Sequence, residues 1–431
     1  MKYPLILFIA LFFSLSLVAQ VKVPFDQFFE GKTLRIDCYS MGTKTEEIIS
    51  LDELREEPYW AGSKTNLLDP FNYGKYIVKV FDLNTNQLIY SRGYCTLFGE
   101  WQTTDEAAKG FKRSLHNSVL IPYPKHRVQV TISARDRENI FQEIYSIVVD
   151  PKSIQIKKDR PYKNFTVSKI LYNGEPSKKV DILFIGDGFA KDEMEKFRRD
   201  VKRFTDILFQ YSPFKEKKDR FNVWAIEAVS DDSGPDDPRK GLFRSTAVGT
   251  SFNTFDSARY LTTTENRMMR DIASNAPYDT IFIMVNTSQY GGGGIYNFYS
   301  VFATDNEYDA YLAVHEFGHG FAGLGDEYYS SQVAYSDAYP PGVEPWEPNI
   351  TALLDKENVK WKALLTAGMP CPTPEDKEKY GKVVGCFEGA GYAAKGLFRP
   401  MIDCKMFSKG YAAFCPVCAK AISDMIDFHS E

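Results

Sequence analysis

The sequence predicts two folded parts, an all-β domain followed by an α/β domain that carries a metal-binding helix. Residues 20–155 contain short segments of β-branched and aromatic residues separated by turn residues. Residues 165–431 open with the apolar strand KVDILFIGDG at 179–188 and a helix pattern over 192–209, which is how an α/β layer begins. Further on, YLAVHEFGHGFAGLGDEYY at 311–329 places two histidines and a glutamate on one helix.

Residues 1–19 predict a secretory signal peptide. Lys2 precedes an apolar run from Leu5 to Leu17, which is too short to span a membrane, and the small Ala19 marks the expected cleavage point. No cysteine stands near that point, so a lipid anchor is not expected. We therefore expect a protein that is secreted, either periplasmic or extracellular, with no membrane span.

The first domain is expected to be a β-sandwich. In 128–133, apolar and polar residues alternate, which indicates a strand with one buried face. Six strands are expected, at 33–39, 75–81, 87–94, 114–121, 127–133 and 141–149. His116 and His126 stand alone among these strands, so we expect them to be structural or exposed. Charged residues 156–164 are expected to link this domain to the next.

In the second domain we expect strands at 221–229 and 280–285, helices at 266–273 and 412–429, and a long irregular region over 330–390. Four glycines, Gly291 to Gly294, precede an aromatic segment at 295–302 that is expected to be one strand leading to the metal-binding helix.

His315 and His319 are the candidate metal ligands. Residues four apart lie on one face of a helix, so both imidazoles can reach one ion. Zinc suits two neutral imidazoles and a third protein ligand, and a catalytic zinc keeps a fourth position for water, whose pKa it lowers to about 7. Glu316 points toward the same pocket and is the candidate general base for that water.

The third ligand must follow the helix. Gly320, Gly323 and Gly325 disfavour its continuation, because each glycine costs about 1 kcal/mol relative to alanine in a helix interior. A positive φ at Gly323 would turn the chain back under the metal and bring Asp326 or Glu327 to it. Asp326 is preferred for its short side chain, and Glu327 is the alternative.

The string HEFGHGFAGLGDEYY, with Gly323 and the Asp-Glu-Tyr of 326–328, resembles the signature of the IgA-peptidase family of metzincin-like zinc endopeptidases. In the common metzincin pattern the glycine falls seven residues after the first histidine and the third ligand ten. Here Gly323 is eight after His315 and Asp326 eleven after it. The resemblance covers roughly residues 165–431, preceded by a domain like the one that often stands before this catalytic domain. It implies a zincin-like fold, zinc as cofactor, and protein or peptide substrates.

The resemblance also implies two further features of the site. Metzincin-like enzymes place a methionine in a tight turn beneath the zinc, and by position in the pattern Met406 is chosen over Met401. The edge strand ahead of the zinc helix lines the substrate cleft in zincins. The residues that this implies as substrate-binding are Gly293, Gly294, Ile295, Tyr296 and Asn297. On composition alone, the same glycine-rich stretch also fits a flexible surface loop.

Seven cysteines and an aspartate-rich loop give the remaining candidates. Cys371 and Cys386 flank a polar loop and are the preferred disulfide pair. For Cys415 and Cys418, a buried or disulfide role is favoured over half of a zinc site, because the chain has no second CxxC. The four aspartates in 230–238 are a minor candidate for calcium, although aspartate and proline are also common turn formers.

These observations predict a secreted zinc endopeptidase. A net charge of −5 argues against nucleic acid or anionic membrane as a partner, and the oligomeric state is not predicted. One alternative is a non-catalytic binding protein with a structural or degenerate zinc site, against which Glu316 argues because a structural zinc needs no base. Another is an amidase that acts on cell-wall peptide by the same chemistry. Immunoglobulin as the substrate does not follow, because residues of the cleft decide specificity.

Overall fold

The computed structural model describes residues 22–160, 164–329, 339–410 and 412–431. The predicted signal peptide lies outside these residues. No helix in the described part of the chain is long and apolar enough to cross a membrane.

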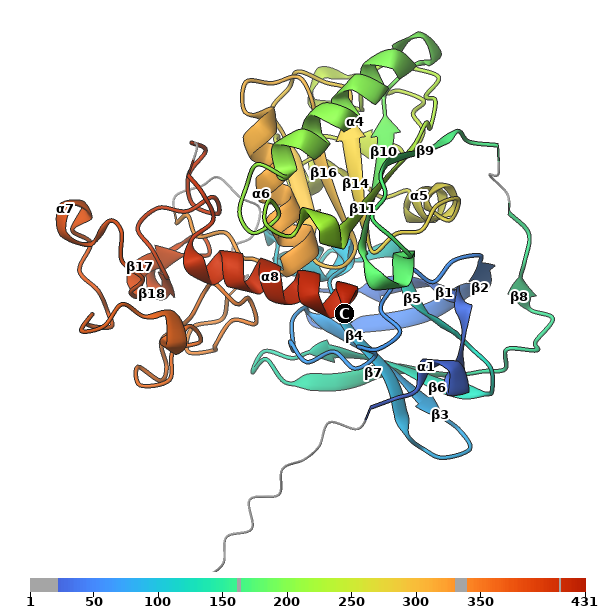
Figure 1. Ribbon diagram of the computed structural model, residues 1–431, viewed down its shortest axis with the longest axis horizontal. Coiled ribbons are helices and arrows are strands. Elements are labelled where there is room, and N and C mark those ends of the chain that lie inside the picture. Colours follow the sequence, from blue (N-terminus) through green and yellow to red (C-terminus); the bar gives the residue numbers. More distant parts are fainter. Residues whose placement is uncertain (1–21, 161–163, 330–338, 411) are drawn as a thin grey trace, which may run out of the picture.

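Two four-stranded sheets make up the N-terminal domain, which lies in the lower half of Figure 1. The first has the order β5-β1-β2-β8 and the second β4-β3-β6-β7. Their strands are β1 (Phe29–Gly42), β2 (Glu47–Glu57), β3 (Tyr76–Asp82), β4 (Leu88–Tyr94), β5 (Arg113–Pro124), β6 (Val128–Arg135), β7 (Phe141–Val149) and β8 (Ile156–Lys157). Three short helices accompany them: α1 (Phe25–Phe28), α2 (Leu97–Trp101) and α3 (Asp105–Ala108). Apolar residues from both sheets share one core, so all six predicted strands are present and packed together.

Strand β2 was not predicted, because charged residues occupy most of its buried positions, Glu53, Arg55 and Glu57 beside Ile49 and Leu54. Arg35 of β1 is fully buried and its guanidinium donates to Glu57 of β2 at 3.0 Å and to Asp37 at 3.1 Å. It also donates to Asp271 of the second domain at 2.6 Å. A strand that faces a buried ion network lacks the apolar alternation by which strands are recognised. The short strand β8 pairs with β2, so the first residues of the predicted linker 156–164 belong to this sheet.

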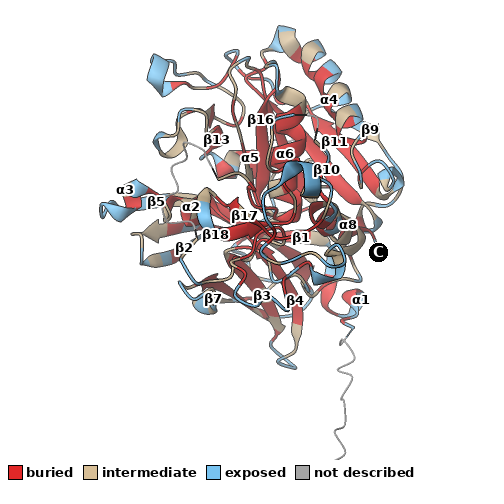
Figure 2. Ribbon diagram, turned by 90° about the vertical axis from the view of Figure 1, so that its left-hand side faces the viewer, coloured by how far each residue is buried: buried red, intermediate tan, exposed pale blue. Residues whose placement is uncertain are grey.

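The second domain is built on a six-stranded sheet with the order β15-β16-β14-β10-β11-β9, in the upper half of Figure 1. Its strands are β9 (Val167–Leu171), β10 (Val180–Asp187), β11 (Phe221–Ile226), β14 (Thr280–Val285), β15 (Gly292–Ile295) and β16 (Tyr299–Ala303). The four central strands are parallel, and the two edge strands β9 and β15 are antiparallel to their neighbours. Every residue of β10, β11, β14 and β16 is buried, as continuous apolar runs in a covered parallel sheet should be (Figure 2).

Four helices accompany the sheet: α4 (Met194–Leu208), α5 (Asn266–Ala273), α6 (Asp309–Ala322) and α8 (Pro416–Ser430). Helix α6 packs on β14, β15 and β16, and also contacts α4 and α8. The predicted helix 266–273 and strand 280–285 are confirmed residue for residue. The predicted helix 192–209 corresponds to α4 after a 3-10 turn, and 412–429 to α8.

The predicted single strand 295–302 is wrong, because the chain forms a hairpin there. The glycines belong to β15, and the chain then reverses into β16. Asn297 has a φ of 52°, and the N–H of Phe298 donates to the carbonyl of Ile295 at 3.0 Å. Asparagine tolerates this left-handed conformation better than most residues. The turn was not predicted from the sequence, because the aromatic residues on either side of Asn297 are typical of strands.

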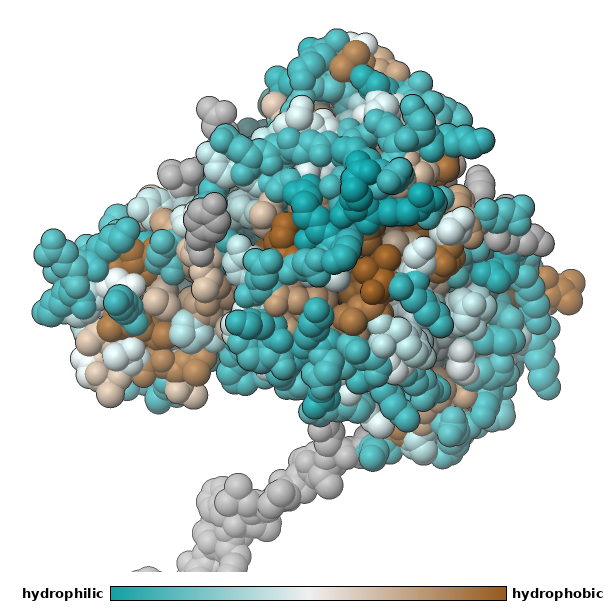
Figure 3. All heavy atoms as spheres, turned by 45° about the horizontal axis from the view of Figure 1, so that its top comes forward, coloured by the Kyte–Doolittle hydropathy of each residue, from teal (hydrophilic) through white to brown (hydrophobic). Residues whose placement is uncertain are grey.

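The C-terminal part before α8 is mostly irregular, as predicted. It contains α7 (Lys377–Tyr380) and the hairpin of β17 (Phe387–Ala390) and β18 (Ala393–Arg399), at the left of Figure 1. Cys371 and Cys386 form the predicted disulfide. The remaining elements are β12 (Thr250–Ser251), β13 (Thr262–Thr263) and 3-10 turns at Pro176–Lys178, Lys191–Glu193, Lys218–Arg220, Pro238–Lys240, Thr254–Asp256 and Lys362–Leu364. The face drawn in Figure 3 is mainly hydrophilic, with apolar residues in small separate groups.

The two domains are joined by direct hydrogen bonds as well as by Arg35. The N–H of Cys95 donates to the carbonyl of Tyr296 at 2.9 Å, and the side-chain amide of Asn297 donates to the carbonyl of Gly93 at 3.0 Å. The turn between β15 and β16 is therefore anchored on the N-terminal domain. The edge strand β15 is thus held by β16 along its length and by the N-terminal domain at its turn.

Candidate active site

Helix α6 presents the predicted metal-binding residues. Val314 and Phe317 of this helix are fully buried, and the ring centroid of Phe317 lies 5.4 Å from that of Phe282 in β14, which orients the helix on the sheet. The helix ends at Gly323, whose φ of 64° is the positive value predicted for the turn. Its N–H donates to the carbonyl of His319 at 3.0 Å, and the chain then turns back toward the histidines.

Three ligand atoms converge beside α6. The Nε2 atoms of His315 and His319 are 3.1 Å apart, and Oδ1 of Asp326 lies 3.0 Å from the first and 3.2 Å from the second. Four ligands placed tetrahedrally about zinc, at bond lengths of about 2.0–2.1 Å, are separated by about 3.3 Å. The triangle therefore has nearly the size that a single zinc ion requires.

Hydrogen bonds to the other ring nitrogens explain why these three atoms need a cation. Nδ1 of His319 lies 2.5 Å from the carbonyl oxygen of Leu324, and Nδ1 of His315 lies 3.1 Å from that of Lys405. A carbonyl accepts only, so each Nδ1 carries the proton and each Nε2 presents a lone pair. Oδ1 of Asp326 is buried and has no well-formed hydrogen bond among the described residues. Burial opposes charge on His319, but the carboxylate of Asp326 raises its pKa to about 9, so a proton balances this group without metal, and a metal cation can take the place of that proton.

The carboxylates of the site are electrostatically unequal. Burial disfavours the charge of Asp326, but the neighbouring imidazoles of His319 and His315 hold its pKa well below the usual range. Burial raises the pKa of Glu316 above its usual value, with the imidazoles opposing the shift. A raised pKa suits a general base, because it brings the proton affinity closer to neutral pH. Gly292 leaves room for this carboxylate, since a Cβ there would lie 2.8 Å from Oε1 of Glu316.

Asp326 and Glu327 point to different sides of their segment. Asp326 faces the histidines, whereas Oε1 of Glu327 accepts from the side-chain amide of Asn349 at 3.0 Å, away from the site. The structure therefore brings Asp326, the preferred candidate, to the histidines, and Glu327 to another cluster.

Met406 lies against helix α6. Its side chain is fully buried, and its sulfur lies 3.1 Å from where a Cβ on Gly318 would be. The carbonyl of Met406 accepts the N–H of Glu327 at 2.9 Å, so this turn supports the segment that carries Asp326. Met401 is only partly buried. Its role as the methionine beneath a metal stays a prediction.

The model of the family described as IgA Peptidase M64 matches residues 169–383 and 376–426, which is more than half of the chain. The chain belongs to this family. A second model, described as Peptidase M64 N-terminus, matches residues 24–146 of this M64 protein. No curated protein matches this chain significantly. Membership of the M64 family makes the protein a peptidase with protein substrates, and members of this family are generally metallopeptidases.

A cavity of about 650 Å³ opens over the site of this M64 peptidase. His315, Glu316, His319 and Asp326 form part of its lining, and the opposite wall comes from the N-terminal domain. Residues of that wall include Glu47, Lys75, Glu100 and Arg135. The N-terminal domain is thus part of the cleft.

The predicted substrate-binding residues divide into two groups. Gly293, Gly294 and Tyr296 line this cavity. Ile295 is 1% exposed and Asn297 forms the hairpin turn, and neither lines it. Asn297 lies in the turn beyond β15, and Ile295 ends β15 with its side chain buried, so the cavity wall here is formed by the other three predicted residues.

The edge of β15 that faces away from β16 is short. The N–H of Ala303 donates to the carbonyl of Gly291, and alternation along an antiparallel pair then directs the polar groups of Gly292 and Gly294 outward. The carbonyl of Gly292 accepts from Leu261 at 3.4 Å. The outward N–H and C=O of Gly294 lie between the Leu261–Gly292 hydrogen bond and the N-terminal domain, beside helix α6.

Sequence reasoning missed an aromatic and basic group at the site. The hydroxyl of Tyr392 donates to Oδ2 of Asp326, and Tyr328, Tyr290 and Arg259 also line the cavity. Burial raises the pKa of Tyr290 to about 12, so its hydroxyl remains protonated near neutral pH. The only available signal was the high aromatic content, 15% of the chain, which does not identify particular rings.

The minor candidates have ordinary structural roles. His116 lies 3.2 Å from Asp52 and 2.9 Å from the side-chain amide of Asn266, as a structural histidine would. In the aspartate-rich loop, Asp232 and Asp236 accept backbone N–H groups of the same region. The described residues of 230–238 do not bring three acidic ligand atoms together at one point, so the calcium prediction has no structural support there.

Proposed function

We propose that this protein is an exported zinc endopeptidase with a zincin-like catalytic domain behind a β-sandwich domain. His315, His319 and Asp326 hold the zinc, and Glu316 is the general base. The observation that carries the proposal is the convergence of three lone-pair atoms, about 3 Å apart, on a point beside Glu316 in the cavity.

A zinc ion bound there supplies Lewis-acid activation of water and of the scissile carbonyl. The residues of the chain supply the rest. Carbonyl oxygens of Leu324 and Lys405 keep the Nε2 lone pairs of the histidines turned inward. Glu316 takes a proton from the attacking water and passes it to the leaving amine, for which its raised pKa is suited. Arg259 and Tyr290 face the same space and offer donors to the substrate carbonyl.

The substrate is proposed to be an extended polypeptide that crosses the cavity between the two domains. It pairs with the outward N–H and C=O of Gly294, which stand directly beside α6. A Cβ on Gly294 would lie 2.4 Å from the carbonyl oxygen of Glu316, so only glycine allows the strand to approach the helix this closely. Side chains of the bound peptide then contact the wall built by the N-terminal domain.

Export is proposed from the signal-like segment 1–19 together with the disulfide between Cys371 and Cys386. Structural disulfides persist in oxidising compartments and are rare in the cytosol.

The proposal is tested by Glu316→Gln, assayed on a denatured protein substrate with zinc content measured in parallel. We expect zinc and fold to be retained while turnover falls about 10²- to 10⁴-fold. Glu307→Gln is the matched control, because Glu307 is exposed and lies just before the same helix. A Glu316→Gln variant that cleaves as fast as the parent would exclude Glu316 as the base.

A further inference from the structure

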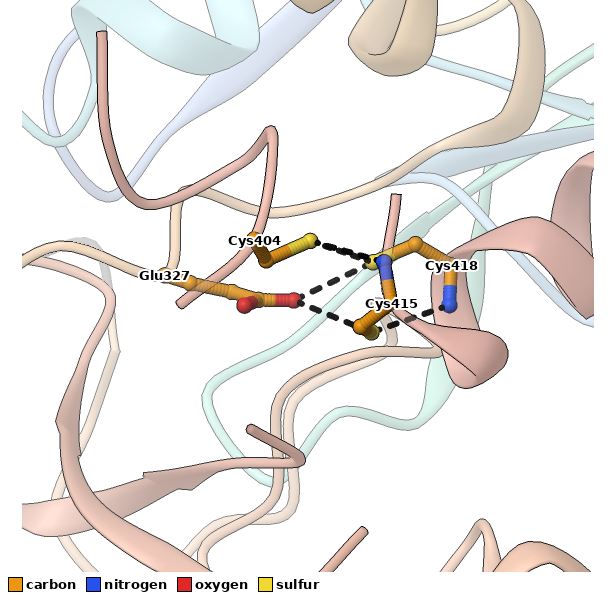
Figure 4. A group of neighbouring side chains, drawn as sticks. All are labelled: Glu327, Cys404, Cys415 and Cys418. Carbon is orange, nitrogen blue, oxygen red and sulfur yellow. Dashed lines mark hydrogen bonds between the residues drawn. The ribbon is translucent and has the colours of Figure 1, made fainter. Parts of the chain in front are cut away.

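A second cluster of ligand atoms lies on the other side of the Asp326–Glu327 peptide. Glu327, Cys404, Cys415 and Cys418 place one carboxylate oxygen and three sulfurs within 4.8 Å of one another (Figure 4). Glu327, Cys404 and Cys418 are fully buried, and Cys415 is 3% exposed. This cluster does not line the active-site cavity.

The distances in the cluster match tetrahedral zinc coordination. Two sulfurs bound to one zinc at about 2.3 Å lie about 3.8 Å apart, and a sulfur and an oxygen about 3.5 Å apart. The Sγ atoms of Cys404 and Cys418 are 3.8 Å apart. Oε1 of Glu327 lies 3.1 Å from Sγ of Cys418 and 4.0 Å from Sγ of Cys415, values that lie on either side of the ideal one.

Backbone donors are aimed at the sulfurs. The N–H of Cys415 donates to Sγ of Cys404 at 3.2 Å, and the N–H of Cys418 donates to Sγ of Cys415 at 3.4 Å. Sulfur accepts such bonds best as a thiolate, the form that binds metal. Cys415 caps the N-terminus of α8, and Cys418 lies in its first turn, where the helix dipole favours negative charge.

The carboxylate of Glu327 is fully enclosed and lacks enough partners for its charge. Oε1 faces the sulfurs, and Oε2, the second oxygen of the group, is buried without a hydrogen-bond partner among the described residues. Burying such a carboxylate is costly, and a cation bound at Oε1 compensates its charge. A disulfide between two of the three cysteines would not compensate the buried carboxylate and would leave the third sulfur without a partner for bonding. The same structure contains a formed disulfide at Cys371–Cys386, whereas these sulfurs stand at a coordination distance.

We propose that Glu327, Cys404, Cys415 and Cys418 bind a second, structural zinc ion. All four positions are filled by protein atoms, which leaves none for water or substrate. The ion joins three segments that shape the active site. Glu327 follows Asp326 in the chain, Cys404 precedes Lys405 and Met406, and the other two cysteines begin α8. Binding exchanges thiol protons for the metal, so the site fills with release of protons.

The decisive measurement is zinc per chain in the mature protein, by elemental analysis after dialysis against metal-free buffer. We expect two zinc ions in the parent, one in His319→Ala and one in Cys415→Ser. Cys38→Ser is the matched control, because Cys38 is a fully buried thiol in the other domain, and it should keep both ions. Replacing the zinc of His319→Ala by cobalt should give an intense near-ultraviolet thiolate charge-transfer band. This readout does not depend on a cysteine variant folding.

Two results would overturn the proposal. One is a His319→Ala protein that folds without metal and gives no thiolate band with cobalt. The other is a low thiol count: seven cysteines less the disulfide pair leave five thiols, and a denatured, chelated sample that titrates only about three contains a disulfide instead. Loss of activity in Glu316→Gln bears on the first site alone, so failure of the proposed function and failure of this inference are distinguishable.

Discussion

Two clusters of candidate metal ligands flank one peptide bond, and they differ in access. The cluster of His315, His319 and Asp326 opens on the cavity between the domains. The cluster around Glu327 is sealed in the core between α6 and α8. Neighbouring side chains in an extended segment point to opposite sides, so adjacent carboxylates serve different clusters. The comparison shows how one short segment can connect an open site suited to catalysis with a closed site suited to structure.

The hydrogen bonds around the ligand residues also differ between the two clusters. In the open cluster, carbonyl oxygens hold the protons of the histidine rings and leave neutral nitrogens as ligands. In the closed cluster, backbone N–H groups point at the sulfurs and favour thiolates. Backbone groups around each cluster thus favour the charge state in which its ligands bind metal: neutral imidazole in one and thiolate in the other.

The largest expected effect separates activity from stability. His319→Ala should abolish peptidase activity with a small change in the free energy of unfolding of the zinc-loaded protein. Cys415→Ser should lower that free energy by more than about 4 kcal/mol, the range reached by loss of a metal site. Activity assays and denaturant titrations of both variants check this. Equal stability losses in the two variants would mean that the clusters do not differ in role.

The two carboxylates offer a finer comparison. Asp326→Ala should remove the catalytic zinc, because one of three protein ligands is lost. Glu327→Ala should weaken that zinc only about 10- to 100-fold, the usual cost of losing an outer support, while the closed cluster loses its own ion. Zinc titration of each apo variant measures both sites. The reverse order of affinities would assign the third ligand of the open site to Glu327.

Chelation should distinguish the clusters by rate. A chelator such as 1,10-phenanthroline can enter the cavity, so activity should disappear before the thermal transition moves. The second zinc should leave only when the protein opens locally, and the melting temperature should then fall. Time courses of activity, metal release and melting temperature give the order. Simultaneous loss of both signals would contradict the difference in access.

Substrate binding should be visible at the open site alone. An extended inhibitor with a zinc-binding group should slow hydrogen exchange of the Gly294 amide, which faces away from β16. The amides of Cys415 and Cys418 should be unaffected, which makes them an internal control. If exchange at Gly294 stays unchanged with the inhibitor bound, another segment pairs with the substrate.

The smallest effect concerns Lys405, which lies in the chain between the clusters. Its side chain is 1% exposed, and burial lowers its pKa from 10.5 to about 8. Between pH 8 and 10.5 the unfolded state then binds more protons than the folded state, so this residue's contribution to stability rises with pH in that window. Lys405→Met should therefore be stabilising at pH 7, with an advantage that shrinks as the pH approaches 10. Urea titrations of both proteins across this range check the sign, and a constant advantage would refute it.

Much of the architecture followed from local patterns. The apolar runs of β10 and β14, the helix at 266–273 and the turn at Gly323 were predicted because period, length and glycine chemistry are local properties. Strand β2 and the β15–β16 hairpin were missed. In β2 most buried positions hold charged residues, of which Arg55 lies 3.8 Å from Asp271 of the second domain, and in the hairpin a single asparagine reverses an otherwise aromatic strand pattern.

The sequence by itself determined the helical pair His315 and His319 with Glu316, because their spacing lies within one element and helix geometry fixes their common face. It left Asp326 and Glu327 as alternatives, and tertiary structure separated them by giving each carboxylate a different partner. The thiol cluster depended mainly on tertiary structure. The CxxC spacing of Cys415 and Cys418 is local, but Glu327 is distant from the three cysteines in the chain, and only packing α8 against the turn of Met406 brings the four ligand atoms within 4.8 Å. The same is true of the cleft, whose second wall is supplied by a domain with no catalytic signature of its own.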